Sequence, residues 1–297
     1  MAKPQKEMTF YRKRATAYTL FALPQTLIYI VFFIAPILLG IFYSFTDYNG
    51  IKKEIQFVGF SNYKSMFTTG HFGRAMIFNL KYCLLTVTLS IVIGLALALL
   101  LTSKIKGRGI FRSLYFLPAV LPGLTMGLIF NIIFGKGLPQ LGAALGIEAL
   151  SKSLLSSPAT ALYALVAVSL WGGVAIPTVL FMAGLQTIPQ ELIESTELDG
   201  ATPWQRFRYL KMPFLRPTLS MVFVLKLKGG LMVFDTIMAL TGGGPAGTTE
   251  SMASLIYQHG FVERKMSQGM AEALVLALIV CTISIVQIAW SNRKQVY

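Results

Sequence analysis

Charged residues are scarce in this chain of 297 residues: they make up 13% of it, against 55% hydrophobic residues. Soluble domains carry about 25% charged residues, so the composition excludes an ordinary soluble fold. Acidic residues are the scarcest, with 12 Asp and Glu against 26 Lys and Arg, which gives a formal net charge of +14. The basic residues are scattered between apolar stretches and form no patch with interleaved aromatics, so nucleic-acid binding is not indicated. Basic loops retained on the cytoplasmic side of a membrane explain the charge better.

Residues that could carry redox or metal chemistry are also few. The two cysteines, Cys83 and Cys281, both fall in apolar segments and are expected to be packing residues. His71 and His259 stand alone in predicted outer loops, without a second histidine or thiol at ligand spacing. The sequence therefore predicts no metal site.

Enzymatic signatures are missing as well. The one Gly-Lys pair, Gly135-Lys136, lacks the glycine five residues earlier that a phosphate-binding loop requires. No Ser/His, paired-Asp or metal constellation lies within the apolar segments. We therefore expect that the chain is not an enzyme, holds no cofactor and does not hydrolyse ATP itself. There is also no internal repeat at a fixed period and no low-complexity tract.

Long apolar runs dominate what is present. Several exceed the roughly 20 residues needed to cross a bilayer. We predict an all-α integral membrane protein with six transmembrane helices in a single domain over residues 1–297. The predicted spans are 19–43, 75–101, 111–134, 159–184, 214–240 and 270–290. Prolines inside them should kink or break helices, and these are Pro24, Pro36, Pro118, Pro122 and Pro177.

The distribution of Lys and Arg predicts the orientation. With the N-terminus inside, the inner segments hold 5, 4, 4 and 2 basic residues, which sum to 15, and the outer segments hold 4, 2 and 2, which sum to 8. The excess predicts that both termini are cytoplasmic. The basic N-terminal stretch precedes an apolar run that is too long for a signal peptide and lacks a cleavage site, so we expect a retained first span.

One polar stretch, residues 188–217, contains more helix-start and helix-stop signals than a simple connection between two spans needs. It holds four of the 12 acidic residues and four basic ones. Pro189 and Glu191 start a first helix, and Gly200 supplies a left-handed stop. Thr202 then caps a second helix, which we expect Pro213 to end. The predicted unit, a coupling loop over 186–213, is two short helices joined at an angle, with apolar side chains that need a partner.

The stretch 194–201, ESTELDGA, resembles the EAA motif of importer-type ABC transporter permeases, which is Glu-Ala-Ala, three residues and Gly. The wider match is to sugar permeases similar to the larger maltose-type membrane subunit. It includes the stretches 185–189 (LQTIP), 234–235 (FD) and 240–245 (LTGGGP). The sequence departs from the motif at Ser195-Thr196, where the family has two alanines, and at Met212, where it has leucine.

The resemblance implies a type I ABC importer permease fold in which this loop is a coupling helix that docks on an ATP-hydrolysing subunit. The motif glutamate is Glu194, and Gly200 shapes the bend. The residues implied in ATPase coupling are Glu194, Glu197, Asp199, Gly200, Ala201, Trp204 and Phe207. A rigid pair of helices can transmit a rigid-body movement, whereas a floppy loop would absorb it.

A charged side chain inside a membrane span costs free energy, so each one suggests a functional role. Lys226 lies in the fifth predicted span on a helical face with two glycines and a valine, and a similar face occurs in the fourth span. Lys228 lies about 200° from Lys226 on an ideal helix, so one face cannot present both. Counting from Glu194 along the family pattern places the sugar contacts of the maltose-type permease on the same two faces. The implied substrate-path residues are Ser169, Gly172, Gly173, Ile176, Lys226, Gly229, Gly230 and Val233.

Most polar amides and the aromatic residue of the family's sugar site are missing here. Lys226 favours an acidic sugar, such as a uronic or sialic acid derivative, bound by charge-assisted hydrogen bonds. Two alternatives remain open: the lysines pair with carboxylates of a partner subunit, or they extend to the membrane surface.

The resulting prediction is a subunit of a binding-protein-dependent ABC importer for a carbohydrate in the cell membrane. The implied partners are a second, related permease subunit, two ATP-binding subunits, an extracellular solute-binding protein and membrane lipid. The alternative function is an ion- or proton-coupled secondary transporter. It would need buried carboxylates, yet Asp235 is the only acidic residue well within a predicted span, and no inverted repeat is evident.

Overall fold

The computed structural model describes residues 18–103 and 108–293. In these ranges every regular element is a helix, and the one β-type pairing is an isolated antiparallel bridge between Thr46 and Phe57. The predicted all-α class is confirmed.

The helices are short in several places because prolines, glycines and π-helical turns interrupt them. Within the described ranges the first one covers Tyr18–Ser44 and includes a π-helical turn. In chain order the labelled elements are η1 (Ile30–Ile34), α2 (Ala35–Ser44), α3 (Ser61–Thr68), α4 (His71–Thr102), α5 (Arg108–Phe116), η2 (Leu117–Val120), α6 (Gly123–Ile132), η3 (Ile133–Gly137), α7 (Leu138–Leu145), η4 (Glu148–Leu150), α8 (Pro158–Gly173), α9 (Ala175–Gln186), α10 (Gln190–Leu198), α11 (Pro203–Gln205), η5 (Arg206–Lys211), α12 (Met212–Leu231), α13 (Asp235–Leu240), α14 (Met252–Tyr257), η6 (Gln258–Val262) and α15 (Met266–Arg293).

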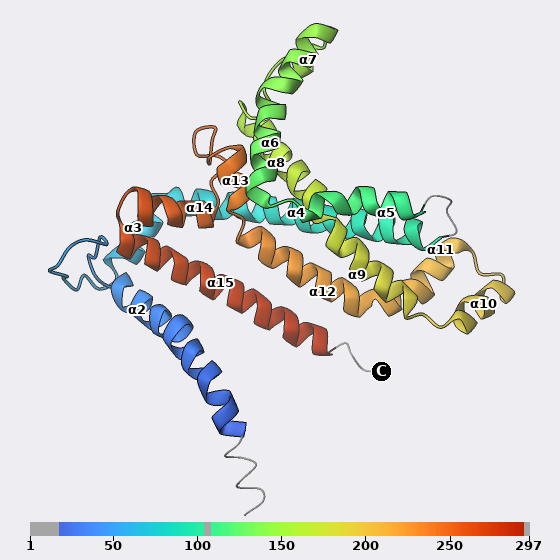
Figure 1. Ribbon diagram of the computed structural model, residues 1–297, viewed down its shortest axis with the longest axis horizontal. Coiled ribbons are helices and arrows are strands. Elements are labelled where there is room, and N and C mark those ends of the chain that lie inside the picture. The colour runs from blue at the N-terminus through green and yellow to red at the C-terminus, as the bar shows by residue number, and fades with distance from the viewer. Residues whose placement is uncertain (1–17, 104–107, 294–297) are drawn as a thin grey trace, which may run out of the picture.

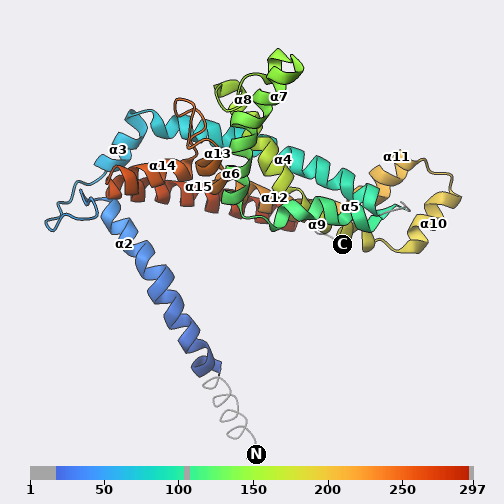
Figure 2. The ribbon, with the colours of Figure 1, turned by 45° about the horizontal axis from the view of Figure 1, so that its top comes forward.

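Four helices, α4, α9, α12 and α15, run side by side along the long axis of the molecule (Figure 1). The short helices α10 and α11 lie at one end of this axis, and α3 lies at the other. The first helix diverges from the body, and the column of α6 and α7 stands out to one side, as a second view confirms (Figure 2). The molecule is therefore an elongated bundle with two projecting helical arms.

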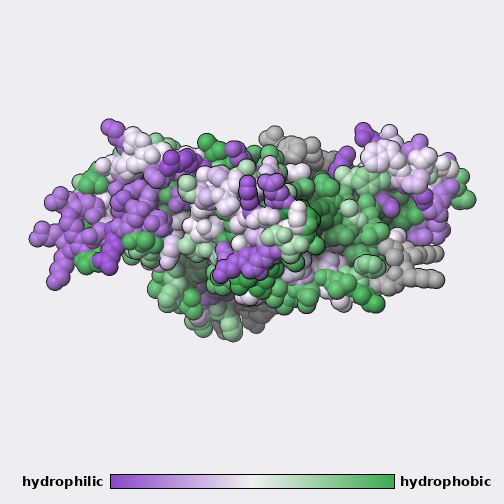
Figure 3. Space-filling view, turned by 90° about the horizontal axis from the view of Figure 1, so that it is seen from above, coloured by the Kyte–Doolittle hydropathy of each residue, from purple (hydrophilic) through white to green (hydrophobic). Residues whose placement is uncertain are grey.

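Its surface matches a membrane protein with polar ends. On the face shown in Figure 3, hydrophilic residues gather at both ends of the long axis, and hydrophobic residues lie between them around a smaller polar patch. The helix Tyr18–Ser44 has no buried residue within its most apolar 18-residue window. Such a side has to face lipid or another subunit.

The helix lengths and compositions do not confirm the predicted count of six spans. In the described ranges, four helices are long and apolar enough to cross a membrane, and the bent pair of α8 and α9 raises the total to five. The four are Tyr18–Ser44, His71–Thr102, Gly123–Leu145 and Met266–Gln287. The fifth predicted span corresponds to α12, a helix of 20 residues that contains Arg216, Lys226 and Lys228 and ends before α13. The six-span arrangement remains a prediction.

The third predicted span, 111–134, differs most from the structure. The break predicted at Pro118 and Pro122 is present, because Pro118 lies in the 3-10 turn η2 and Pro122 directly precedes α6. The longer apolar helix then continues beyond the predicted end, through the π-helical turn η3 to Leu145. Pro24 and Pro36, in contrast, do not break the first helix, where a π-helical turn precedes Pro36.

Close contacts between helices depend on small residues. A Cβ atom on Gly94 of α4 would lie 2.8 Å from Cβ of Pro177 in α9. One buried cluster, which includes Phe181, Leu185 and Leu215, packs α4, α9 and α12 together toward the end that carries α10. The packing of these helices fixes where the loop between α9 and α12 is held.

Candidate coupling loop and translocation site

The loop between α9 and α12 folds as two helices joined at a corner, as predicted. The first is α10, and the second is α11, which continues as the π-helical segment η5. Gly200 lies at the corner with φ +70°, a left-handed conformation that glycine adopts without a steric penalty. Both helices lie at one end of the long axis, opposite to α3 (Figure 1).

Side-chain bonds brace this corner. Arg206 of η5 forms an ion pair with Glu197 of α10, so the two helices are tied directly. Thr202 and Gln205 form a capping box: Gln205 N donates to Thr202 Oγ1 at 3.3 Å, and Thr202 N donates to Gln205 Oε1 at 2.7 Å. The loop therefore has a defined conformation that its own side-chain bonds hold.

Apolar anchors attach the unit to the bundle. Ile188 is buried, and Ile193 packs against the same cluster as Phe181 and Leu215. The opposite side of the loop is open, because Leu198 is 89% exposed and Trp204 is 65% exposed. A surface that presents large apolar side chains at a polar end of the molecule is suited to contact with another protein.

The residues predicted for ATPase coupling gather on this unit. Most are exposed, while Ala201 and Phe207 are half-buried. The rings of Trp204 and Phe207 lie 5.5 Å apart between centroids. Glu194 accepts a hydrogen bond from Gln190 Nε2 at 3.1 Å, one turn earlier on α10. The exposed coupling residues are Glu194, Glu197, Asp199, Gly200 and Trp204.

The predicted end of the second helix was wrong. Pro213 does not stop it, and the chain continues without interruption from η5 into α12. Met212 N donates to Phe207 O, five residues earlier, so the wider π-helical register already differs when the proline enters. As a result the loop is continuous with α12, a rigid connection between the corner and the bundle.

The fourth predicted span is the bent pair, α8 followed by α9 at an angle of 47°. The kink predicted from Pro177 is present. At the bend, Lys226 Nζ of α12 donates a hydrogen bond to the backbone carbonyl of Gly173. Lys228, in contrast, is exposed. The structure thus brings together one residue from each of the two predicted substrate-path faces.

The other substrate-path residues do not all share one open surface. Tyr82 Oη and Ser169 Oγ lie 2.6 Å apart, a Cβ on Gly172 would meet the Met126 side chain, and a Cβ on Gly230 would lie 2.5 Å from Cys83 Sγ. Val233 is buried in the core cluster that contains Tyr82 and Met126. Ile176 is 48% exposed, and a Cβ on Gly229 would have no neighbouring atom within 4 Å. Of the eight, Ile176 and Gly229 have open space beside them, and Gly173 and Lys226 are joined by their hydrogen bond at the bend.

A second broken helix was not predicted. Chain order places α12 and α13 within one predicted span, but the helix ends at Leu231 and resumes at Asp235. Asn79 of α4 donates to Gly230 O at 3.0 Å and to Leu231 O at 3.1 Å, and its Oδ1 accepts from Met252 N at 2.7 Å. One buried amide therefore satisfies backbone groups from two other elements. The polar Asn79 within an apolar run was the sequence signal for this role.

The two histidines are not isolated, contrary to the expectation from the sequence. Their rings lie 6.4 Å apart between centroids. His259 Nδ1 lies 2.7 Å from Glu272 Oε1, and both side chains are buried. Glu272 is fully buried and also accepts from Gln268 Nε2 at 3.2 Å. Among the described residues, no group of three His, Cys, Asp or Glu side chains is placed to hold a metal ion.

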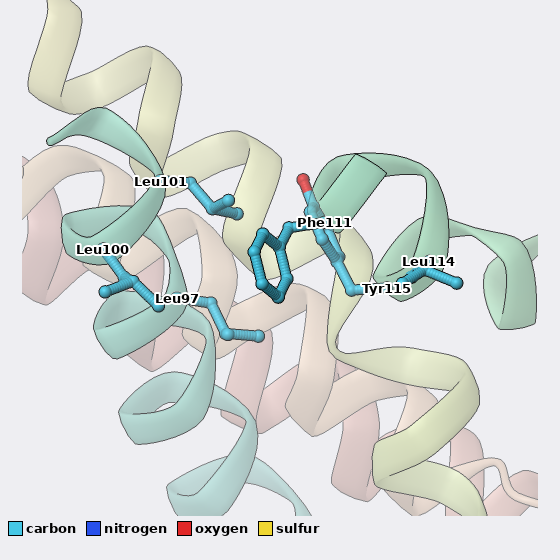
Figure 4. A pocket seen from close by; sticks show the side chains of 6 residues that line it. All are labelled: Leu97, Leu100, Leu101, Phe111, Leu114 and Tyr115. Carbon is cyan, nitrogen blue, oxygen red and sulfur yellow. The ribbon is translucent and has the colours of Figure 1, made fainter. Parts of the chain in front are cut away.

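A cavity of about 530 Å³ lies elsewhere, between the ends of α4 and α5 (Figure 4). Its lining is apolar, and Phe111 and Tyr115 of α5 face leucines of α4 across it. It does not include any of the predicted substrate-path residues. A groove of this composition does not offer the hydrogen bonds that a sugar needs.

These features define a class: a multi-pass membrane protein with a braced helical loop at one polar end and broken helices in its interior. The chain belongs to the family of binding-protein-dependent transport system inner membrane components, whose model matches residues 90–295.

Similar proteins cover nearly the whole chain. The multiple sugar-binding transport system permease protein MsmF of Streptococcus mutans is 43% identical over 276 residues, which are 93% of this chain and 95% of MsmF. The probable starch degradation products transport system permease protein AmyD of Thermoanaerobacterium thermosulfurigenes is 33% identical over 296 residues, 100% of this chain and 99% of AmyD.

A solved structure shares the fold. It is a bacterial ABC transporter involved in the import of the acidic polysaccharide alginate, with a TM-score of 0.82 and 19% identity over 97% of this chain and 99% of that chain. The type I importer permease fold implied by the sequence resemblance is confirmed.

Proposed function

We propose that this chain is a membrane-spanning permease subunit of an ATP-driven ABC importer that translocates a carbohydrate delivered by a solute-binding protein. The observation that carries the proposal is the braced loop between α9 and α12, in a chain that resembles sugar permeases over nearly its full length. The loop connects α9 to α12 and is helically continuous with α12, so a displacement of the loop would move that helix too. Nothing in the comparisons favours an ion- or proton-coupled secondary transporter.

The loop is proposed to dock on an ATP-hydrolysing subunit. Glu194 and Trp204 are exposed on it, and the coupled movement requires that the pair of helices is stiff. In the reconstituted transporter, we expect Glu194→Ala to abolish ATP-dependent uptake while the ATPase subunits keep their own activity. Glu191→Ala, one turn earlier on α10, is the matched control and should transport normally. Equal uptake by both variants would reject the coupling role.

Further subunits are needed because one chain offers one such loop. We propose a second, related permease subunit, two ATP-binding subunits and an extracellular solute-binding protein. The open sides of the diverging first helix are consistent with contact to the second permease subunit or to lipid. The masses of the complex purified through this chain test the composition: a complex without a second permease chain would reject it.

Both termini are proposed to lie in the cytoplasm, on the same side as the loop. The excess of basic residues in the predicted inner segments supports this orientation. Single cysteines at Leu198, which ends α10, and at Phe57, in the connection between α2 and α3, provide the test. Their side chains are 89% and 73% exposed, and α10 and α3 lie at opposite ends of the molecule (Figure 1). A membrane-impermeant thiol reagent should reach position 198 only from the cytoplasmic side and position 57 only from outside.

For the substrate, we propose an acidic sugar that passes beside the bend of α8 and α9. Lys226 is half-buried there, and none of the ion pairs among the described residues includes it. An ammonium group has three donors, and one of them is used by Gly173 O. Lys226→Met should therefore weaken uptake of an acidic sugar more than uptake of a neutral sugar of the same size. An unchanged ratio would reject the acidic substrate.

A further inference from the structure

A backbone hydrogen bond is missing at the bend between α8 and α9. On one side of the gap Val174 N donates to Leu170 O at 2.9 Å, and on the other Thr178 N donates to Val174 O at 3.1 Å. In the same pattern, residue 177 would donate to the carbonyl of Gly173, but Pro177 has no N–H. Inside a membrane protein an unpaired carbonyl is costly, so Gly173 O needs a donor from outside its own helix.

Lys226 is that donor. Its ammonium hydrogen-bonds to Gly173 O from α12, a helix 53 residues further along the chain. A Cβ atom on residue 173 would lie 2.8 Å from Lys226 Nζ, so the amine can sit there only because residue 173 is a glycine. Three residues thus form a joint at the bend: Pro177 leaves the carbonyl without a backbone donor, Gly173 leaves room for the amine, and Lys226 supplies the donor.

The joint lies at one end of a tightly packed pair of helices. Toward the loop, a Cβ on Gly184 of α9 would lie 2.6 Å from Thr218 Oγ1 and 2.9 Å from Leu215 Cδ2, both of α12. The loop itself joins α9 to α12 through α10 and η5. Helices α9 and α12 are therefore tied twice, by close packing near the loop and by Lys226 at the bend.

Helix α8, beyond the bend, packs against α4, as α9 and α12 also do. It has further neighbours in α6 and α13, and Gly172 faces Met126 of α6. The Lys226 bond is a direct link from α12 to Gly173, the last residue of α8, in addition to the contacts that both parts share with α4. Loss of this bond would loosen the angle at the bend.

We propose that Lys226 is a positioning residue that sets the angle between α8 and α9 and transmits movement of the α9–α12 pair to α8. Its amine replaces the N–H that Pro177 lacks. Because the donor is a side chain of a neighbouring helix, the bond can break and re-form while every helix keeps its own backbone bonds. The effect on transport rests on the proposed importer function, whereas the effect on the bend does not.

The test compares the same lysine variant in two backgrounds. The Pro177→Ala substitution restores the backbone N–H at that position, so Gly173 O no longer needs Lys226. Spin labels at Tyr163 of α8 and Ala183 of α9, both exposed, report the distance across the bend in the full transporter in nanodiscs without substrate. Transport per ATP hydrolysed is measured on the same samples.

We expect Lys226→Met to broaden the label–label distance distribution. We also expect it to lower transport per ATP about tenfold, which corresponds to a tenfold change in the equilibrium between the bonded and the open bend. Lys226→Arg, which keeps a charged donor, should retain most of both. In the Pro177→Ala background, where the pair is straighter and the mean distance longer, adding Lys226→Met should change neither quantity further. Lys228→Met, on an exposed position of the same helix, is the control and should match the wild type.

Two outcomes would overturn the proposal. The first is a distance distribution that is unchanged in Lys226→Met, and the second is an equal effect of that variant with and without the Pro177→Ala substitution. Failure of the importer function looks different, because the wild type would then show no ATP-dependent uptake while the distances still respond to Lys226. A substrate contact is also distinguishable, since it would change uptake but not the substrate-free distances.

Discussion

The ammonium of Lys226 binds the carbonyl of Gly173 at the position where Pro177 leaves the helix without a donor. The bond joins α12 to the bend of the α8–α9 pair. The bond gives the Lys226 charge a structural role in the interior of the bundle. The other two N–H donors of the ammonium remain available.

Gly173→Ala should reproduce the loss of this bond without removing the charge. The new methyl group would lie 2.8 Å from Lys226 Nζ and displace it. Although alanine favours a helix by up to about 1 kcal/mol over glycine, we expect lower uptake per ATP and a broadened bend. Gly40→Ala, where a Cβ has no neighbour within 4 Å, is the control and should be neutral or stabilising. A Gly173→Ala variant that transports like the Gly40→Ala control would contradict the prediction.

The corner of the coupling loop should depend on glycine at position 200. Its φ of +70° is unfavourable for any residue with a Cβ, by roughly 1–2 kcal/mol. Gly200→Val should therefore distort the corner and uncouple ATP hydrolysis from uptake. Gly146→Val tests strain alone, because Gly146 has a φ of +68° and open surroundings but ends α7, far from the loop. Equal losses of uptake in the two variants would show that the corner has no special role.

Much of this loop could be predicted from the sequence, because its signals are local. Pro189, Gly200 and the cap at Thr202 each act over three or four residues, and the apolar runs are long enough to mark membrane helices without further information. The third span shows the limit of such signals: the prolines mark a break, but they do not say how far the next helix continues.

The interior bonds could not be predicted, since they join distant parts of the chain. Lys226 and Gly173 are 53 residues apart, and Asn79 and Gly230 are 151 residues apart. Helical periodicity placed Lys226 on a face but not against a partner. The same limit explains why Gly172 and Gly230 looked like the lining of a path, although packing places other helices against them.

Asn79 should be a stability hot spot at the second broken helix. Asn79→Leu would leave the carbonyls of Gly230 and Leu231 and the amide of Met252 without their side-chain partner. Each buried polar group left unpaired costs about 1–3 kcal/mol. We expect a clear drop in the melting temperature of the purified protein, and a smaller drop for Asn79→Asp, which keeps the acceptor for Met252. A melting temperature of Asn79→Leu within error of the wild type would refute this role.

The buried His259–Glu272 pair should make stability depend on pH. The hydrogen bond to Glu272 raises the pKa of His259 above its usual value of 6.5, even though burial opposes the shift. A raised histidine pKa contributes stability that is complete below about pH 6.5 and is lost as the pH rises through the higher folded-state value. Because Glu250, His71 and Arg74 also face this region, the change has to be measured as a difference between proteins.

Melting temperatures of the wild type and of His259→Gln between pH 5.5 and 8.5 give that difference, roughly one unit below and two above the usual histidine pKa. Glutamine can still donate to Glu272 but does not titrate. We expect the advantage of the wild type to shrink as the pH rises. An advantage that is constant over this range would exclude His259 as the titrating group.

The most direct test of the importer function is uptake by the complete transporter with ATPase subunits that bind ATP but cannot hydrolyse it. Proteoliposomes with the solute-binding protein and a labelled sugar outside provide the assay, and wild-type ATPase subunits provide the control. We predict that uptake against a gradient falls to the level of protein-free liposomes. Uptake that persists without hydrolysis, driven instead by an ion or proton gradient, would contradict the assignment of this chain as an ATP-driven permease.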